Sequence, residues 1–194
     1  MILGLKRGKV VLVPHQPGWA ARFEEEKRLL TEVLGTSLLA IEHVGSTSVP
    51  DLLSKPVIDI AILVLSLDDI ESWPGLLHPH GYVCLGDREG RGDHFFAKGP
   101  DEQRTVYLHV VASTGPLWGS YLKFREVLRH QPRARLEYEG LKQQALEMHR
   151  HDRRAYTAAK DAWIQRVLAG EYDDRRADPQ AGPLEAGNQR SASV

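Results

Sequence analysis

Cysteine is nearly absent from this chain of 194 residues, which contains Cys84 alone. A lone cysteine excludes an internal disulfide framework and is typical of a reducing compartment. Cys84 stands in the apolar run Tyr-Val-Cys-Leu, which favours a buried structural thiol over the alternative, a reactive one. We therefore assign no catalytic chemistry to this side chain.

Long hydrophobic runs and an excess of one charge are also missing. No apolar run approaches the roughly 20 residues that a bilayer span needs, and the first residues lack the apolar core of a signal peptide. We therefore expect a cytoplasmic protein without a membrane partner. The 25 basic and 26 acidic residues give a formal net charge of -1. Because this balance provides no overall attraction for polyanions, nucleic acid is not an expected partner, and any polyanion needs a local basic patch.

The chain does contain enough apolar sequence for a hydrophobic core, since 42% of its residues are hydrophobic. Its length predicts one domain over residues 1–170. Within that domain we expect a core sheet over about 9–114 and helices over about 116–169. Residues 171–194 are rich in Asp, Arg, Gly, Pro and Ser, a composition that predicts a disordered tail.

Hydrophobic periodicity predicts an α/β (α+β) fold, with a mixed twisted sheet of about five strands flanked by helices and a helical C-terminal part. We expect the acidic cluster at 24–26, on a helix over 19–34, to lie on a solvated face. A second helix, over 68–77, is predicted to be capped by Asp68. The other expected elements are an extended arm at 10–13, strands at 38–44, 57–65, 82–85, 94–98 and 105–112, and helices beginning at about 117, 133 and 152, the last ending at about 168.

The most informative stretch is residues 41–65, in which a strand, a Gly-Ser-Thr-Ser turn and a long apolar strand follow one another. Asp59 interrupts the second strand. An ionised carboxylate inside an apolar strand costs several kcal/mol unless it is paired, hydrogen-bonded or bound to a metal. We therefore expect Asp59 at a strand end, facing a site; the alternative is the polar face of an edge strand.

The turn at residues 45–48 has two possible roles. Gly45 permits close backbone approach, and the three hydroxyls that follow it can either cap a helix or hydrogen-bond a phosphate. Ser48 is the predicted N-cap of a short helix that ends at Leu53. The sequence Gly-x-x-x-x-Gly-Lys is absent, which excludes a P-loop.

Other polar groups stand in apolar or helical surroundings. His109 interrupts an apolar strand, and it is either a core histidine with a satisfied hydrogen bond or part of the site. Bases on the C-terminal helices can form a local positive patch, although a solvated helix face is the favoured explanation of each one individually. These bases are Arg125, Arg129, Lys142 and Lys160.

The order of strand, Gly-Ser turn and Asp-bearing strand resembles the signature of the DNA polymerase beta-like nucleotidyltransferase superfamily. A longer match resembles the GrpB family over about residues 9–169. That family is similar to the nucleotidyltransferases in fold and includes members fused to dephospho-coenzyme A kinase. The matching segments are residues 43–50 (His-Val-Gly-Ser-Thr-Ser-Val-Pro), 55–60 (Lys-Pro-Val-Ile-Asp-Ile), 108–111 (Leu-His-Val-Val), Trp118 with 122–125 (Leu-Lys-Phe-Arg), and 156–160 (Tyr-Thr-Ala-Ala-Lys).

The resemblance implies a role for each matching residue. Asp59 corresponds to the first metal-binding carboxylate, and His109 stands where active transferases have a third acidic ligand, so these two are the predicted catalytic residues. Phosphoryl transfer needs metal ions that bridge phosphate oxygens, which explains acids on a strand beside a phosphate-binding turn. The predicted ligand-binding residues are Gly45, Ser46, Thr47, Ser48, Lys55, Arg125 and Lys160.

Two positions depart from the family pattern. Ala61 occupies the second carboxylate position, and Asp51 stands where the family usually has glycine. Because Asp59 with one imidazole is a poor site for two magnesium ions, the predicted cofactor is a single divalent cation, with manganese or zinc favoured over magnesium. The predicted metal ligands are Asp59, His109, His43 and His94.

Three functions remain open at this point. The first is a metal-dependent nucleotidyltransferase that moves a nucleotidyl group from a nucleoside triphosphate to a small acceptor. The second is a binding module that retains nucleotide or another phosphorylated small molecule without catalysis, because Ala61 removes one metal ligand. The third is a metal-dependent hydrolase or lyase built on Asp59 and the histidines. The oligomeric state is not predicted.

Overall fold

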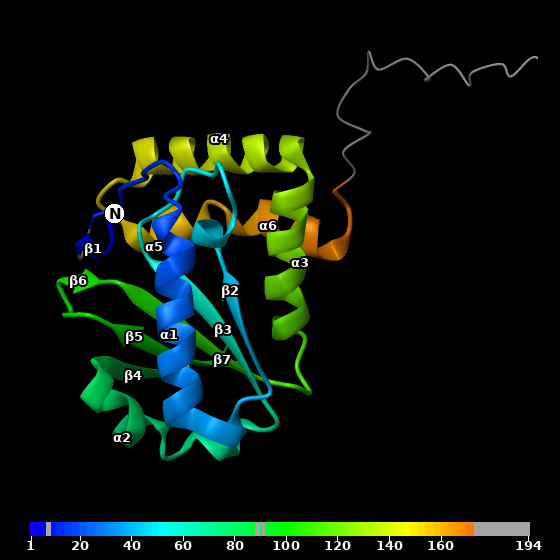
Figure 1. The fold of residues 1–194 in the computed structure, drawn as a ribbon. Coiled ribbons are helices and arrows are strands. Elements are labelled where there is room, and N and C mark those ends of the chain that lie inside the picture. The colour runs from blue at the N-terminus through cyan, green and yellow to red at the C-terminus, as the bar shows by residue number, and fades with distance from the viewer. Residues whose placement is uncertain (7–8, 88–89, 91, 173–194) are drawn as a thin grey trace, which may run out of the picture.

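The computed structural model describes residues 1–6, 9–87, 90 and 92–172 (Figure 1). Residues 173–194 of the predicted disordered tail lie outside the described residues. Within the described part of the chain, each helix is too short or too polar to span a membrane. The main sheet has five strands in the order β2 (Ala40–Val44), β3 (Ile58–Val64), β7 (Val106–Ala112), β5 (Asp93–Lys98) and β4 (Tyr82–Asp87).

The centre of this sheet is the parallel pair β3 and β7, and every other pairing in it is antiparallel. Both central strands are nearly continuous apolar runs, because a strand with both faces covered needs no polar alternation. A separate pair joins β1 (Leu5–Lys6) to β6 (Gln103–Arg104). The predicted arm at 10–13 is extended, and Val13 pairs with Ser54. The predicted mixed sheet of about five strands is therefore confirmed.

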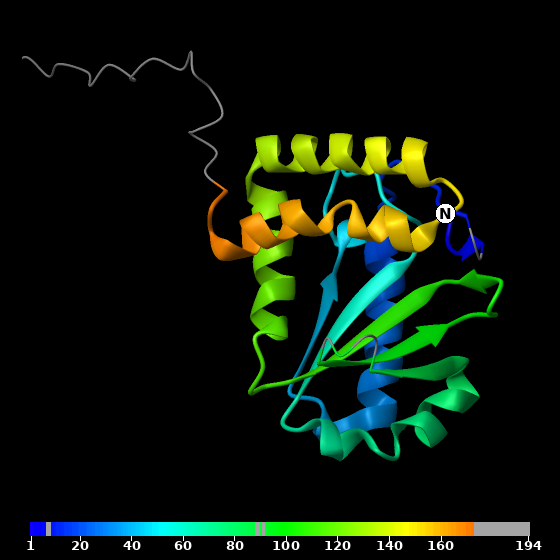
Figure 2. The same ribbon diagram turned by 180° about the vertical axis from the view of Figure 1, so that it is seen from behind.

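Helices cover the sheet from two sides (Figures 1 and 2). On one side, α1 (Gly18–Leu34) and α2 (Trp73–Leu77) pack on the alternating residues of β3 and β7 that form the main core; we call this the α1 face. The opposite side, which we call the α3 face, is covered in part by α3 (Leu117–His130) and the helices after it. Those helices are α4 (Pro132–His149), α5 (Arg153–Ala158) and α6 (Asp161–Ala169).

Several predicted helices differ in detail from the structure. The helix predicted over 68–77 is divided into a 3₁₀ helix, Leu67–Ile70, and α2. Its cap is not Asp68 but Ser66, whose hydroxyl accepts the Asp68 backbone N–H at 3.1 Å. The helix predicted over 152–168 is also divided, into α5 and α6, with Lys160 at the junction.

The predicted capping role of Ser48 is wrong. Residues Ser46–Ser48 form one short 3₁₀ turn that is not followed by a helix. The Ser48 hydroxyl donates a hydrogen bond back to the Gly45 carbonyl at 2.7 Å. It therefore closes the turn instead of capping a helix.

The predicted solvation of the whole acidic cluster on α1 is wrong for Glu26, which is only 1% exposed. Its carboxylate accepts hydrogen bonds from the Tyr82 hydroxyl at 2.6 Å and from Lys98 Nζ at 2.9 Å. Arg22 on the preceding helical turn also donates to it. Glu26 therefore ties α1 to the strands β4 and β5.

Candidate functional site

The site begins at the Gly-Ser turn, where β2 ends. Gly45 has φ +69°, a left-handed value that favours glycine. Because Val44 pairs with Asp59, the turn lies directly beside the Asp59 side chain. A Cβ atom at position 45 would lie 2.5 Å from Asp59 Oδ2. Glycine is therefore required for the carboxylate to lie against the turn.

Asp59 is the second residue of β3, and its side chain is 31% exposed. Since β3 lies between β2 and β7, the alternative of an edge strand is wrong. Burial opposes ionisation of Asp59, but the hydrogen bond and charge of His109, together with Lys55, hold its pKa below the usual range. The residue is therefore an ionised acid that meets solvent on the α3 face.

His109 on β7 is held between two carboxylates. Its Nε2 atom lies 3.5 Å from Asp59 Oδ1, and its Nδ1 atom lies 3.0 Å from Asp93 Oδ2. Burial favours the neutral ring, but the two carboxylates outweigh it and raise the pKa of His109. The Tyr121 hydroxyl lies 3.0 Å from Nδ1 as well. This arrangement favours the protonated imidazole and orients it beside Asp59, as a buried acid orients the rings of many functional histidines.

Asp93 and Tyr121 were not predicted from the sequence. Asp93 is buried and is the first residue of β5. Phe95, two residues later, pairs with His109, so Asp93 lies on the α3 face as His109 does. Tyr121 comes from α3. No local sequence pattern links either residue to His109. The pairing of β5 with β7 brings Asp93 to His109, and the docking of α3 brings Tyr121 there.

The predicted metal ligands are not brought to one place. His43 and His94 pair with Ile60 and Val110, so both lie on the α1 face, opposite Asp59 and His109. His43 Nε2 lies 3.0 Å from Thr47 Oγ1. His94 Nε2 lies 3.1 Å from the Sγ atom of Cys84, which is half-buried instead of buried as predicted.

The residues present therefore do not fit a two-metal centre. Ala61, at the second carboxylate position, pairs with His109 and is fully buried. Over the described ranges of the chain, no group of three His, Cys, Asp or Glu side chains is placed to hold a metal ion. A single cation on Asp59 and His109 remains a prediction.

Two of the predicted basic residues hold the turn in place. Arg125 donates to Glu42 at 2.7 Å and to the His43 carbonyl at 2.9 Å. Arg129 donates from Nε and a terminal nitrogen to the Ser48 carbonyl, at 3.1 and 2.8 Å. Both guanidinium groups thus bind backbone on either side of the turn, so α3 positions it.

The predicted lysines are buried instead of lying on solvated helix faces: Lys142 is 2% exposed and Lys160 is 6% exposed. Lys160 Nζ lies 4.2 Å from the centre of the Tyr156 ring, and Lys55 Nζ lies 5.4 Å from the same ring. Lys142 lies 4.9 Å from the centre of the Tyr138 ring and donates to the Leu53 carbonyl. We call Lys55, Lys142 and Lys160 the lysine cluster.

Two interactions link the lysine cluster to the turn and to Asp59. The Ser46 side chain hydrogen-bonds Tyr138, whose ring lies under Lys142. Lys55 and Asp59 belong to the same segment, and the Lys55 charge helps to hold the Asp59 pKa low. The turn, Asp59 and the lysines therefore form one polar region between the sheet and the C-terminal helices.

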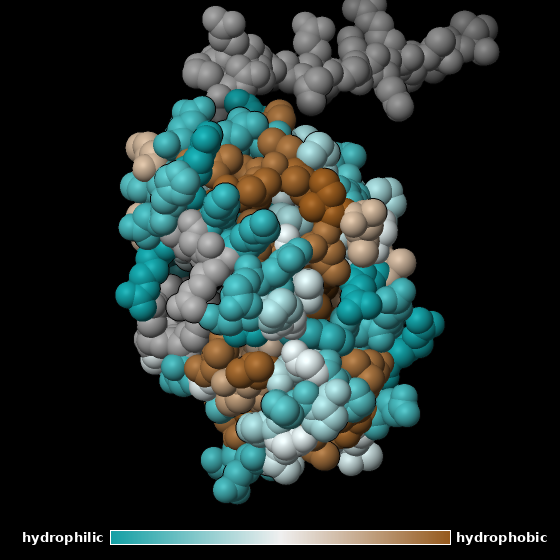
Figure 3. Space-filling view, turned by 90° about the vertical axis from the view of Figure 1, so that its left-hand side faces the viewer, coloured by the Kyte–Doolittle hydropathy of each residue, from teal (hydrophilic) through white to brown (hydrophobic). Residues whose placement is uncertain are grey.

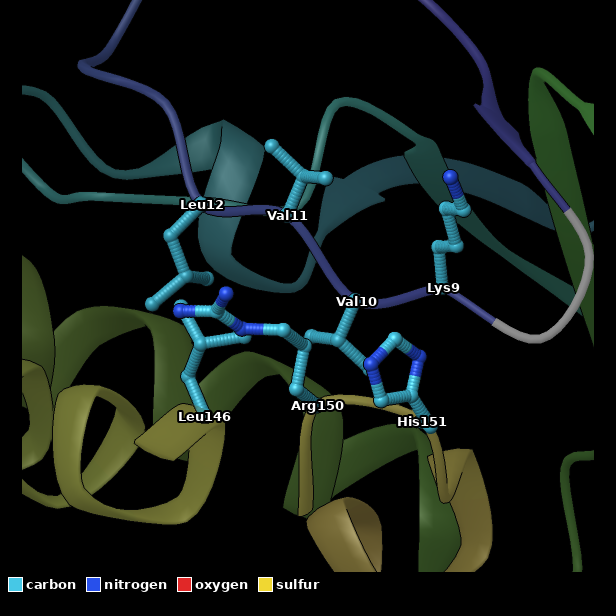
Figure 4. A pocket seen from close by; sticks show the side chains of 7 residues that line it. All are labelled: Lys9, Val10, Val11, Leu12, Leu146, Arg150 and His151. Atoms are coloured by element: carbon cyan, nitrogen blue, oxygen red, sulfur yellow. The ribbon is translucent and has the colours of Figure 1, made fainter. Parts of the chain in front are cut away.

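A pocket of about 410 Å³ lies elsewhere, between the N-terminal arm and the end of α4 (Figure 4). None of the predicted site residues lines it. Figure 3, which views this side of the molecule, shows hydrophobic side chains gathered beside hydrophilic ones. The pocket is lined by Lys9, Val10, Val11, Leu12, Leu146, Arg150 and His151.

A five-stranded mixed sheet, with a Gly-Ser turn that leads into an aspartate-bearing central strand, defines a nucleotidyltransferase-like α/β protein. A family model described as "GrpB protein" matches residues 9–170, and the chain belongs to the GrpB family. The resemblance stated from the sequence is thereby confirmed.

Individual relatives support the same assignment. The glutamate-rich protein GrpB of Alkalihalophilus pseudofirmus is 34% identical over 86% of this chain and 98% of its own length. YqkA of Bacillus subtilis is 34% identical over 81% of this chain, which spans 46% of that relative. The crystal structure of the conserved protein GrpB from Enterococcus faecalis superposes with a TM-score of 0.76 and 30% identity, covering 86% of this chain and 99% of the other.

Proposed function

We propose that this chain binds a phosphorylated small molecule, such as a nucleoside triphosphate, at the turn of residues 45–48. The observation that carries the proposal is the contact between Gly45 and Asp59, with His109 Nε2 only 3.5 Å from the same carboxylate. The half-buried residues Gly45 and Ser46 provide backbone and hydroxyl groups that suit phosphate oxygens, whereas the buried Thr47 and Ser48 hydroxyls donate to the Val57 and Gly45 carbonyls. The His109 charge offsets that of Asp59, so the acid does not repel an anion placed beside the turn.

Thermal unfolding in the presence of nucleoside triphosphates and coenzyme A precursors tests this proposal. A ligand at about 100 times its Kd stabilises the folded state by about 2.7 kcal/mol, which raises Tm by several degrees. Ser46→Ala should reduce the shift, because Ser46 belongs to the turn. Ser113→Ala, at the opposite end of the sheet, should not.

The proposal fails on either of two results. One is that no phosphorylated compound in the panel raises Tm in the parent protein. The other is that Ser46→Ala and the parent show the same shift, which would place the ligand away from the turn.

A second candidate function is nucleotidyl transfer, and the alignment of His109 by Asp93 favours it, since simple binding does not require an oriented imidazole. In this reaction an acceptor hydroxyl attacks the α-phosphorus, a new P–O bond forms, and the bond to pyrophosphate breaks. The hydroxyl proton passes to Asp59, while the His109 cation offsets charge on the phosphate oxygens.

Pyrophosphate release from ATP, measured with a deproteinised small-molecule extract as the source of acceptor, tests this second function. Asp59→Asn should reduce the rate about 100-fold or more, and Asp93→Asn about 10-fold. A parent protein that binds ATP but releases no pyrophosphate above the heat-inactivated control leaves binding as the function.

A further inference from the structure

We propose that the lysine cluster binds the linked phosphates of a polyphosphate chain without a divalent cation. This inference rests on the proposed binding of a phosphorylated ligand and specifies its class, a molecule with two or more linked phosphates. Lys55 comes from the segment before β3, Lys142 from α4, and Lys160 from the junction of α5 and α6. Elements far apart in the sequence thus bring three ammonium groups to one place.

The Lys160 ammonium is the strongest single observation. It is more than nine-tenths buried, and it lies over the face of the Tyr156 ring. Among the described residues, no carboxylate lies within ion-pair distance of it. Burial and the charges of Lys55 and Lys142 lower the pKa of Lys160 to about 7, while Asp161 and Asp59 oppose this shift. A buried ammonium is costly unless an anion neutralises it, so this place favours an anionic ligand.

Lys142 is in a similar environment. Burial lowers its pKa to about 7, against the opposing charge of Glu139 and with help from Lys55. Glu139 accepts the Leu53 backbone N–H at 3.0 Å, and Lys142 donates to the Leu53 carbonyl. Glu139 and Lys142 thus hold the backbone of Leu53 from both sides. This fixes the loop that leads to Lys55 and with it the position of Lys55 relative to Lys142.

Tyr156 provides an independent observation. Its side chain is fully buried, and its hydroxyl has no hydrogen-bond partner among the described residues. A buried hydroxyl without a partner costs about 1–3 kcal/mol. The same ring carries Lys55 and Lys160, so a phosphate bound by these lysines can accept the Tyr156 O–H as well.

The chemistry also explains why a metal is not needed. In phosphoryl transfer, metal ions normally neutralise the phosphate oxygens, and carboxylates hold the metals. Here the second carboxylate position is Ala61, whereas three ammonium groups lie near enough to one another to interact, and Lys142 lies over the Tyr138 ring that Ser46 hydrogen-bonds. Lysine binds phosphate as a compact point charge, and three of them match the charge of a di- or triphosphate better than that of one phosphate.

Isothermal titration of the full chain with inorganic triphosphate, in EDTA and in magnesium, tests the inference. We expect triphosphate to bind in EDTA at least about tenfold more tightly than inorganic phosphate, a difference of about 1.4 kcal/mol. Lys160→Met should weaken triphosphate binding at least tenfold, as should Lys55→Met, which leaves the Lys142 contact to Leu53 intact. Lys27→Met is the matched control, because Lys27 is a half-buried lysine of α1 whose Nζ also lies over an aromatic ring, that of Phe23, and it should bind like the parent.

The possible results separate this inference from the proposed function. Binding that requires magnesium and is weakened by Ser46→Ala but not by Lys160→Met overturns the lysine proposal and leaves the turn as the site. Binding in EDTA that is unchanged in both lysine variants also overturns it. If no phosphorylated ligand binds in either condition, both proposals are wrong.

Discussion

Two constraints meet at Gly45, a left-handed φ of +69° and the contact with Asp59. Gly45→Ala should therefore lower the free energy of unfolding by about 3 kcal/mol, more than backbone strain alone requires. Gly35→Ala is the matched control, because Gly35 also has a positive φ but open space where the Cβ would lie. That variant should lose about 1 kcal/mol. Urea unfolding of both variants measures the difference, and equal losses would show that the Asp59 contact is unimportant for stability.

Asp51 is the one described residue other than glycine with a positive φ, +60°. Glycine adopts this conformation without strain, which agrees with the glycine that the family resemblance implies at this position. Asp51→Gly should raise the free energy of unfolding by up to about 1 kcal/mol, and Asp51→Ala should lower it by about as much. Chemical denaturation of both variants tests the pair. A loss of stability in Asp51→Gly would contradict the explanation.

At the residue scale, the sequence identified groups that interrupt an apolar pattern. Asp59 and His109 stand out for that reason, and the structure places them 3.5 Å apart. The face of the sheet on which a histidine lies depends on strand register, which the sequence alone does not give. For this reason the predicted set of metal ligands included His43 and His94, which lie on the opposite face. The burial of Lys160 depends on how α5 and α6 dock, which no local pattern shows.

At the scale of elements, Glu26 joins α1 to β4 and β5 through Tyr82 and Lys98. Glu26→Ala should lower the free energy of unfolding by about 3–5 kcal/mol, because it leaves the buried Tyr82 hydroxyl and the half-buried Lys98 ammonium without their acceptor. Glu25→Ala is the control, since Glu25 has 52% side-chain exposure and pairs with Arg22 on the surface. Its loss should stay within about 0.5 kcal/mol. Similar losses in the two variants, measured by urea unfolding, would refute the role given to Glu26.

Most elements were predictable because their patterns are long and periodic. The helix α1 and the five strands of the main sheet follow from apolar spacing and glycine stops. The breaks inside predicted helices were missed. Pro74 stands in the first turn of α2, where it begins a helix instead of continuing one, and Asp161 similarly begins α6. In the sequence, the helical spacing of apolar residues continues across both breaks, so it outweighed these local signals of a new helix start.

At the scale of the whole molecule, His43 makes stability depend on pH. Burial lowers the pKa of His43 to about 4. The charge of Asp59 opposes this shift, and the charges of Arg129 and Arg125 add to it. The unfolded chain therefore binds a proton between about pH 6.5 and 4 that the folded chain does not, so stability falls as pH decreases through this range. The loss from this residue is about 3 kcal/mol.

Urea unfolding of the parent and of His43→Gln between pH 4 and 7.5 measures this contribution. The variant should lose less stability than the parent over the same decrease in pH, because it has no imidazole to protonate. Parallel pH curves for the two proteins would show that other groups cause the dependence.

The position of β7 between β3 and β5 has a consequence for biosynthesis. A ribosome synthesises β7 after the other four strands of the main sheet, yet this strand fills the middle of it. Until residues 106–112 emerge, the backbone edges of β3 and β5 lack their partner, and such edges readily pair with other chains. A nascent or prematurely terminated product that stops before residue 106 should therefore aggregate or need a chaperone. In the finished chain, β7 pairs with both exposed edges, those of β3 and β5.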